Sequence, residues 1–245
     1  MLLSNENQNI ANRLLLALPP PELRRLQPLL EHVELVRGQS IYEVGARIKY
    51  IYFVNRGLIS LVRTMHDGRS VEIGVVGTEG MTGSYCLFGI DSAVMDAVGQ
   101  VPGSALRISR ETLRNQATKS SILRDTVGRY MHFAIGAIAQ TAACNRLHSL
   151  EERFCRWLLI AHDSALSDTF LLTHEYLAMM LGVQRPAVSL TANLLQKAGL
   201  ITYKRGRITI SNRPGVKACA CECYLAMTHE FERLFGTRRR PPLRA

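Results

Sequence analysis

The sequence predicts an α+β fold in which an antiparallel β-roll is followed by one long helix and then by a helix-turn-helix with a β-hairpin. Short β-branched runs separated by glycines fill residues 33–108, as expected for a roll of short strands. A stretch without proline and with helical periodicity follows at residues 120–148. Residues 174–193 carry small, glycine and apolar positions at the spacing of two helices that cross around a tight turn.

The N-terminal part is predicted to begin with short helices over residues 10–31, interrupted by Pro19–Pro21. Asp67-Gly68 lies between two apolar runs and predicts a hairpin turn. Many short antiparallel strands joined by glycine turns are typical of a small barrel or roll. We expect strands at Ser40–Tyr42, Tyr50–Val54, Leu58–Val62, Val71–Val76 and Ala105–Ile108.

Ser109 is expected to cap a short helix that ends near Gln116, before the long helix at 120–148. The apolar and small side chains of the long helix form a stripe that one small roll cannot cover completely. We therefore expect the same helix of a second subunit to cover it; the alternative is that the stripe packs only on its own roll. The stripe consists of Leu123, Val127, Tyr130, Ala134, Ala137 and Thr141.

The helix-turn-helix is expected to start at the cap Thr173 and to turn at Gly182, with a second helix that ends near Ala198. Its packing positions are Ala178, Gly182 and Val188, because a small residue lets the helices cross closely and a glycine adopts the turn conformation. Thr191 stands where an aliphatic residue normally packs, and Leu190 and Leu194 are expected to compensate.

The remaining C-terminal elements are a short strand, a hairpin and a closing helix. The strand is predicted at Phe170–Leu172, and the hairpin at Ile201–Tyr203 and Ile208–Ile210 around the turn Lys204–Arg207. A closing helix is predicted at 216–235, and a disordered tail is expected at 238–242.

The charge of this region indicates what it binds. The 42 residues from Tyr176 to Lys217 contain seven Lys or Arg and no Asp or Glu, whereas a merely solvated surface carries both signs. A surface of one positive sign suits the phosphates of DNA. The residues expected to read bases are Gln184, Arg185 and Ser189, and those expected to contact the backbone from the hairpin are Lys204, Arg205 and Arg207.

On these residues the chain resembles the Crp/Fnr family of bacterial transcription regulators over about residues 12–235. The most specific stretches are 172–189 and 194–201. The resemblance implies a cyclic-nucleotide-binding-like jelly roll as sensor (12–118), a dimerisation helix (119–148) and a winged helix-turn-helix domain that binds double-stranded DNA (149–236). It also implies a homodimer that contacts RNA polymerase.

The chain departs from the family pattern in both functional regions. Arg185 matches the first arginine of the family's recognition helix, but Pro186 replaces a glutamate and Leu190 replaces a later arginine, so the family's best-known target sequence cannot be assumed. In the sensor, Ser84 replaces a glutamate and Ala93-Val94 replaces the Arg-Ser or Arg-Thr pair that neutralises a cyclic nucleotide's phosphate. Burying a phosphodiester without a cation is costly, so we expect no regulation by cyclic AMP.

No cofactor is expected, and the oxygen-sensing branch's N-terminal cysteine cluster has no counterpart, because no cysteine precedes Cys86. Cys219, Cys221 and Cys223 are closely spaced and could hold a metal or sense oxidation. The interpretation favoured by the sequence is that they are ordinary buried cysteines of the closing helix, and no metal site is predicted.

The remaining features narrow the protein class. The 245-residue chain carries 30 Lys and Arg against 20 Asp and Glu, a formal charge of +10 that suits a polyanionic partner. The motifs of P-loop NTPases, α/β-hydrolases and zinc proteases are absent from the sequence, so we do not expect an enzyme. Six cysteines without a disulfide framework, no signal peptide and no membrane-spanning stretch favour a cytoplasmic protein. The alternative function is a ligand-sensing or scaffold module whose helix-turn-helix binds protein.

Overall fold

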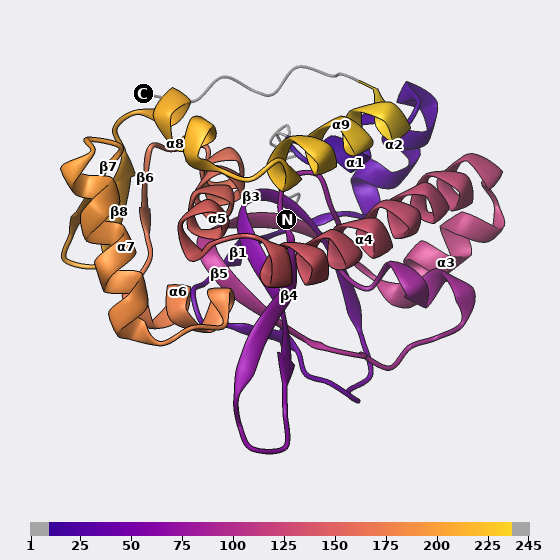
Figure 1. The fold of residues 1–245 in the computed structure, drawn as a ribbon. Helices are drawn as coiled ribbons and strands as arrows, with labels where there is room; N and C mark the ends of the chain where they lie inside the picture. Colours follow the sequence, from indigo (N-terminus) through magenta and orange to yellow (C-terminus); the bar gives the residue numbers. More distant parts are fainter. Residues whose placement is uncertain (1–9, 237–245) are drawn as a thin grey trace, which may run out of the picture.

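The computed structural model describes residues 10–236, so the tail predicted at 238–242 lies outside the described residues. The N-terminal half is an antiparallel five-stranded sheet curled into a roll, which confirms the predicted α+β class (Figure 1). The strand order is β1-β5-β3-β4, and β2 also pairs with β5. The strands are β1 (Glu31–Leu35), β2 (Ser40–Tyr42), β3 (Tyr50–Thr64), β4 (Ser70–Val76) and β5 (Asp96–Ser109).

Two runs predicted as separate strands, Tyr50–Val54 and Leu58–Val62, belong to the single strand β3. The register between β3 and β5 shifts around Arg56 and Leu58, and Gly57 between them has φ +90°. A β-bulge at this glycine lets the strand bend around the roll without ending, which explains why the sequence reads as two pieces. The predicted hairpin at Asp67-Gly68 joins β3 to β4, with Gly68 at φ +83°.

Short helices close the ends of the roll. The N-terminal ones lie on either side of the proline run, as predicted, and Ser109 caps α3 by accepting a hydrogen bond from the backbone N–H of Thr112 (3.0 Å). Together with two 3₁₀ turns they cover a core centred on residues such as Phe53 and Leu106. These elements are α1 (Arg13–Leu16), α2 (Pro20–Leu26), η1 (Gln27–Leu29), η2 (Ser84–Phe88) and α3 (Arg110–Thr118).

The long helix α4 (Ser121–Leu147) has the predicted extent, but its predicted stripe points inward. Leu123, Val127 and Tyr130 are buried in the roll's own core, so their assignment to a subunit interface is wrong: their side chains are already covered. Ala134 packs partly against the same core, and Ala137 and Thr141 line an internal cavity. No helix among residues 10–236 is both long enough and apolar enough to span a bilayer.

The helix-turn-helix and its hairpin lie together beyond α5, at the end of the molecule opposite α3 (Figure 1). A three-stranded sheet of order β6-β8-β7 supports them, and Phe170 on β6 pairs with Ile208 on β8. The elements are α5 (Leu150–Ala165), β6 (Thr169–Leu171), α6 (His174–Leu181), α7 (Arg185–Lys197), β7 (Ile201–Lys204) and β8 (Arg207–Ile210).

The closing helix predicted at 216–235 is in fact two helices, α8 (Arg213–Cys219) and α9 (Cys223–Phe235). Ala220 between them is extended, with φ −79° and ψ 146°, so the chain changes direction there. Helix α9 then runs beside α4 (Figure 1), where Phe231 stacks edge-on against Phe133 at 5.4 Å. The C-terminal helix therefore returns to the N-terminal roll, which a single straight helix could not do.

A buried carboxylate joins the roll to the C-terminal unit. Glu72 on β4 accepts hydrogen bonds from the Trp157 indole (Nε1 to Oε1, 3.0 Å) and from the Ser60 hydroxyl (Oγ to Oε2, 2.5 Å). Burial raises the pKa of Glu72 to about 7, because a charged carboxylate loses its hydration there and these two donors offset only part of that loss. Trp157 lies on α5, so this contact fixes α5 against the sheet.

Candidate nucleic-acid interface

The helix-turn-helix is formed by α6, a tight turn at Gly182 and α7. The Thr173 side chain caps α6 by accepting from the backbone N–H of Tyr176, and Gly182 ends the helix in the left-handed region at φ +63°. Val188 is fully buried and Ala178 nearly so. The three predicted packing positions thus occupy the crossing of the two helices, where a larger residue at 178 or a β-carbon at 182 would force the helices apart or strain the turn.

Thr191 packs in the helix crossing itself, in contrast to the predicted compensation by neighbouring leucines. Its side chain is 7% exposed, and its hydroxyl donates to the carbonyl oxygen of Ala187 (3.1 Å). This bond satisfies the hydroxyl within the helix, so the methyl group can pack as an aliphatic side chain would. Leu190 and Leu194 are instead 64% and 49% exposed, on the outer side of α7.

The outer face of α7 combines polar and apolar side chains. Residues four and three apart on this face point away from the core, so they can enter a groove together. Leu190 and Asn193 belong to this face and are not among the sequence-based candidates, although they lie four and seven residues after Pro186, which is the spacing of one helix face. The exposed residues are Gln184, Arg185, Pro186, Leu190, Asn193, Leu194 and Lys197.

Two of the predicted base-reading residues already have partners. Arg185 pairs with Glu175 (Nε to Oε1, 3.0 Å), which lies one residue before the stretch 176–217 that contains no Asp or Glu. Ser189 hydrogen-bonds through its hydroxyl to Nδ1 of His174 (2.8 Å), and the His174 ring stacks on Tyr203 at 4.2 Å. His174 is half-buried, and burial lowers its pKa, which favours the neutral ring. Ser189 thus ties α7 to α6 and the hairpin.

The three residues predicted to contact the DNA backbone lie at the tip of the hairpin. Lys204, Arg205 and Arg207 are all exposed, and Arg205 and Gly206 both have positive φ (49° and 73°), as in a type I′ turn. The carbonyl oxygen of Gly206 accepts from the backbone N–H of Leu172 (2.8 Å), so the tip is fixed beside the start of α6. The three cations are therefore held on the same side as the N-terminus of the helix-turn-helix.

Not every Lys or Arg of the stretch 176–217 faces outward. Arg213 is only half-exposed and donates to Asp163 (2.7 Å) and to the Tyr224 hydroxyl (2.8 Å). It thereby holds α8 against α5 and α9, a structural role that the sequence window could not distinguish from a DNA-facing one. The surface charge offered to a phosphate backbone comes mainly from the hairpin and the ends of α7.

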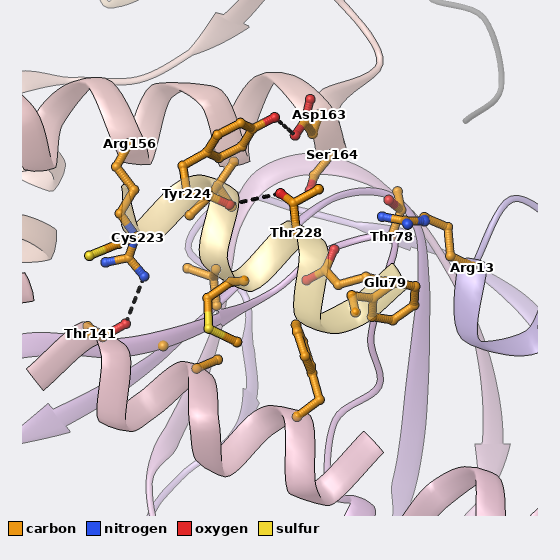
Figure 2. Close-up of a pocket in the computed structure, with 17 residues that line it drawn as sticks. Arg13, Thr78, Glu79, Thr141, Arg156, Asp163, Ser164, Cys223, Tyr224 and Thr228 are labelled. Carbon is orange, nitrogen blue, oxygen red and sulfur yellow. Dashed lines mark hydrogen bonds between the residues drawn. The ribbon is translucent and has the colours of Figure 1, made fainter. Parts of the chain in front are cut away.

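In the sensor, the segment aligned with the family's phosphate contacts offers no cation. Residues 83–94 contain no Lys or Arg, Ala93 is buried, and the one charged side chain, Asp91, is an acid held by Arg47 and Arg110. A separate cavity of about 100 Å³ lies between α4, α5 and α9 (Figure 2). Two carboxylates, Glu79 and Asp163, and two arginines, Arg13 and Arg156, line it, and a volume this small is below the usual range for a nucleotide-sized ligand.

Comparison with known families matches both halves of the chain in this order. Residues 32–120 match the cyclic nucleotide-binding domain family, and residues 152–219 match the Crp-like helix-turn-helix domain family. The second match spans α5 to α8 and so contains the whole candidate interface. No curated protein matches the sequence.

Solved structures with similar folds include three bacterial proteins. FixK2 from Bradyrhizobium japonicum is 16% identical with a TM-score of 0.66, covering 78% of this chain and 98% of its own. A CRP-family transcriptional regulator from Thermus thermophilus is 19% identical with a TM-score of 0.63 (86% and 98% covered). The c-di-GMP-responsive regulator CLP from Xanthomonas campestris is 17% identical with a TM-score of 0.58 (78% and 99%). The two matched domains, in this order and over more than half of the sequence, show that the chain is a DNA-binding transcription regulator of the Crp/Fnr family.

Proposed function

We propose that the protein acts as a homodimer that reads a two-fold symmetric DNA site and that it does so without cyclic AMP. The observation that carries the first part is the uncovered face of α4. Most of its side chains are small or apolar and exposed, and a second copy of the same helix fits them because small residues let two helices approach closely. These are Ile135, Gly136, Ala139, Ala142, Ala143 and Leu147, and the exposed polar residues His132 and Arg146 lie on the same side of the helix.

Within each subunit we assign base reading to the outer face of α7. The guanidinium of Arg185 suits the O6 and N7 acceptors of guanine, and the amide of Asn193 suits adenine. Leu190, at a position where the family has arginine, offers an apolar surface that suits the methyl group of thymine. This set replaces the sequence-based candidate Ser189, whose hydroxyl is engaged by His174.

Base contacts from α7 and phosphate contacts from the hairpin should respond differently to substitution, which gives a direct test. Replacing Arg185 with Ala should cost about 1–3 kcal/mol per subunit on the specific site and little on random DNA, because a lost base contact matters only where the base is right. Replacing Arg207 with Ala should weaken both DNAs and lower the salt slope by about one per lost phosphate contact. The measurement is fluorescence anisotropy on a site selected from random sequence with the purified protein, repeated over a salt series.

Two variants control this experiment. Arg24→Ala removes the same charge at an exposed position of α2, at the opposite end of the molecule from α7 (Figure 1), and should leave binding unchanged. Glu175→Gln releases Arg185 from its ion pair and should leave affinity unchanged or raise it. If Arg185→Ala weakens both DNAs equally, Arg185 is a phosphate contact and the base-reading assignment is wrong. If none of the substitutions affects DNA binding, the scaffold alternative, with a helix-turn-helix that binds protein, takes the lead.

Independence from cyclic AMP is supported by the composition of residues 83–94, which contain no Lys or Arg to neutralise a phosphodiester, while the neighbouring Arg47 and Arg110 are already paired with Asp91. We expect isothermal titration calorimetry with cyclic AMP to give no binding heat at micromolar concentrations and DNA affinity to stay the same when it is added. Cyclic di-GMP, to which CLP responds, is the comparison ligand for the same titration. Saturable binding of one cyclic AMP per subunit would overturn the proposal. Contact with RNA polymerase remains a prediction of the family resemblance.

A further inference from the structure

We propose that Cys144, His148, Cys221 and Cys223 form a binding site for one Zn²⁺ ion, at the junction between α4 and α5. The four ligand atoms lie within 4.8 Å of one another, although Cys144 and Cys221 are 77 positions apart in the sequence. Three thiolates and one imidazole are a standard ligand set of structural zinc sites. Cys219, which the sequence grouped with Cys221 and Cys223, lies beside Cys155 instead.

The spacing of each pair suits a common centre. Cys144 and His148 are four residues apart at the end of α4, so their side chains project from one face of the helix. Cys221 and Cys223 lie on either side of Glu222 where the chain turns between α8 and α9. The break that divides the predicted closing helix therefore brings both thiols to the end of α4.

Two of the distances between the ligand atoms match a tetrahedron around zinc. With Zn–S bonds of about 2.3 Å and Zn–N bonds of about 2.0 Å, neighbouring ligand atoms in a tetrahedron are about 3.5–3.8 Å apart. The Sγ atoms of Cys144 and Cys221 are 3.6 Å apart, and Sγ of Cys223 is 3.6 Å from Nδ1 of His148. A disulfide needs about 2.05 Å between its sulfur atoms, so the present separation is that of metal ligands and not of a bond.

Burial supports the same conclusion. Cys144, Cys221 and Cys223 are at most 5% exposed and form a small cluster of their own, separate from the two aliphatic cores. Ordinary buried cysteines pack as small apolar groups among aliphatic side chains, whereas these three pack on one another.

The surrounding residues orient the ligands as in known zinc sites. A Glu222 carboxylate oxygen lies 3.1 Å from Nε2 of His148, so Nε2 carries the proton and the lone pair of Nδ1 faces the thiols. Gln140 donates from Nε2 to Sγ of Cys223 (3.0 Å), a contact that stabilises a thiolate. The positive charge of Arg156 near Cys144 offsets the net negative charge of Zn²⁺ with three thiolates.

The experiment measures metal and not DNA binding, so it is independent of the proposed function. The full chain is purified under reducing conditions, and its zinc is measured by inductively coupled plasma mass spectrometry. We expect one Zn²⁺ per chain, at least tenfold less in Cys221→Ser and in His148→Ala, and an unchanged value in Cys219→Ser. The last variant is the matched control, because it removes a half-buried thiol from the adjacent helix without touching the site.

Reconstitution of the metal-free chain with Co²⁺ gives the second readout. Three thiolates around tetrahedral cobalt should produce an intense thiolate-to-metal band in the near ultraviolet and ligand-field bands in the visible, and both should be absent from Cys221→Ser. Circular dichroism establishes that the variants are folded, and His148→Ala keeps the test valid if a cysteine variant does not fold. Less than one tenth of an ion per chain after reconstitution, equal zinc in all variants, or a Cys144–Cys221 disulfide under reducing conditions would overturn the proposal.

Discussion

Replacing Ile135 with Glu is expected to convert the protein into monomers and to lower its affinity for a two-fold symmetric site by about 100- to 10,000-fold. Ile135 is 66% exposed and is the largest side chain at the N-terminal end of the uncovered face of α4, so a charge there would be buried against its own copy in a helix pair. The loss of DNA affinity follows because two linked half-site readers bind with a high effective concentration, which separate monomers do not have. Sedimentation velocity and anisotropy on the same preparation measure both effects.

Met65→Glu is the matched control for Ile135→Glu. Met65 is 60% exposed at the turn of the β3–β4 hairpin, which projects away from α4 (Figure 1). This variant should stay dimeric and bind DNA normally, because the same change of side chain is made where no second helix packs. A wild-type chain that sediments as a monomer at micromolar concentration, or an Ile135→Glu variant that remains dimeric, would contradict the α4 interface.

Glu72→Gln is expected to remove a pH dependence of stability worth about 3 kcal/mol between pH 4.5 and pH 7. Within this window the folded protein holds a proton on Glu72 that the unfolded chain has released, since burial raises the folded pKa to about 7 from an ordinary 4.5. Raising the pH therefore lowers the free energy of unfolding, and the loss is complete above pH 7. Glutamine stays neutral and keeps an oxygen for the indole of Trp157.

Urea unfolding at pH 5 and pH 8 provides the measurement, and Trp157 is the single tryptophan of the chain, so its fluorescence reports this contact directly. The wild type should lose about 3 kcal/mol more than Glu72→Gln over this range. Glu43→Gln, at an exposed position on the roll, should follow the wild type. Parallel pH curves for the wild type and Glu72→Gln would mean that Glu72 is already ionised in the folded protein or relaxes toward solvent.

Local signals in the sequence predicted the DNA-reading half well. A cap at Thr173, a glycine at 182 and a turn at Arg205-Gly206 each act over three or four residues, so they can be read without knowing the rest of the fold. The prediction that Leu190 compensates for Thr191 in the helix crossing is wrong, because Leu190 is exposed. Periodicity tells which residues share a helix face, but the Thr191 hydroxyl could satisfy itself within α7 and so take the inner position that a leucine was expected to fill.

The direction in which α4 faces could not be predicted from its own sequence. Its apolar stripe fits a partner helix and an underlying roll equally well, and the roll covers it through contacts such as those of Tyr130 with a core built from distant strands. The cluster of Cys144, Cys221 and Cys223 could not be predicted from the sequence either. Cys144 and Cys221 meet only because α9 returns along α4. Neither the return nor the break at Ala220 has a signature in the few residues around it.

The turn at the tip of the hairpin has backbone strain at Arg205, a residue that we predict to contact DNA. Arg205 adopts φ 49°, a left-handed conformation that costs a side chain with a β-carbon about 1–2 kcal/mol and that asparagine or glycine adopts more readily. A chain optimised only to withstand heat in the absence of DNA would therefore replace this arginine. If Arg205 contacts the phosphate backbone as we predict, a residue that relieves this strain would stabilise the free protein and at the same time remove one phosphate contact.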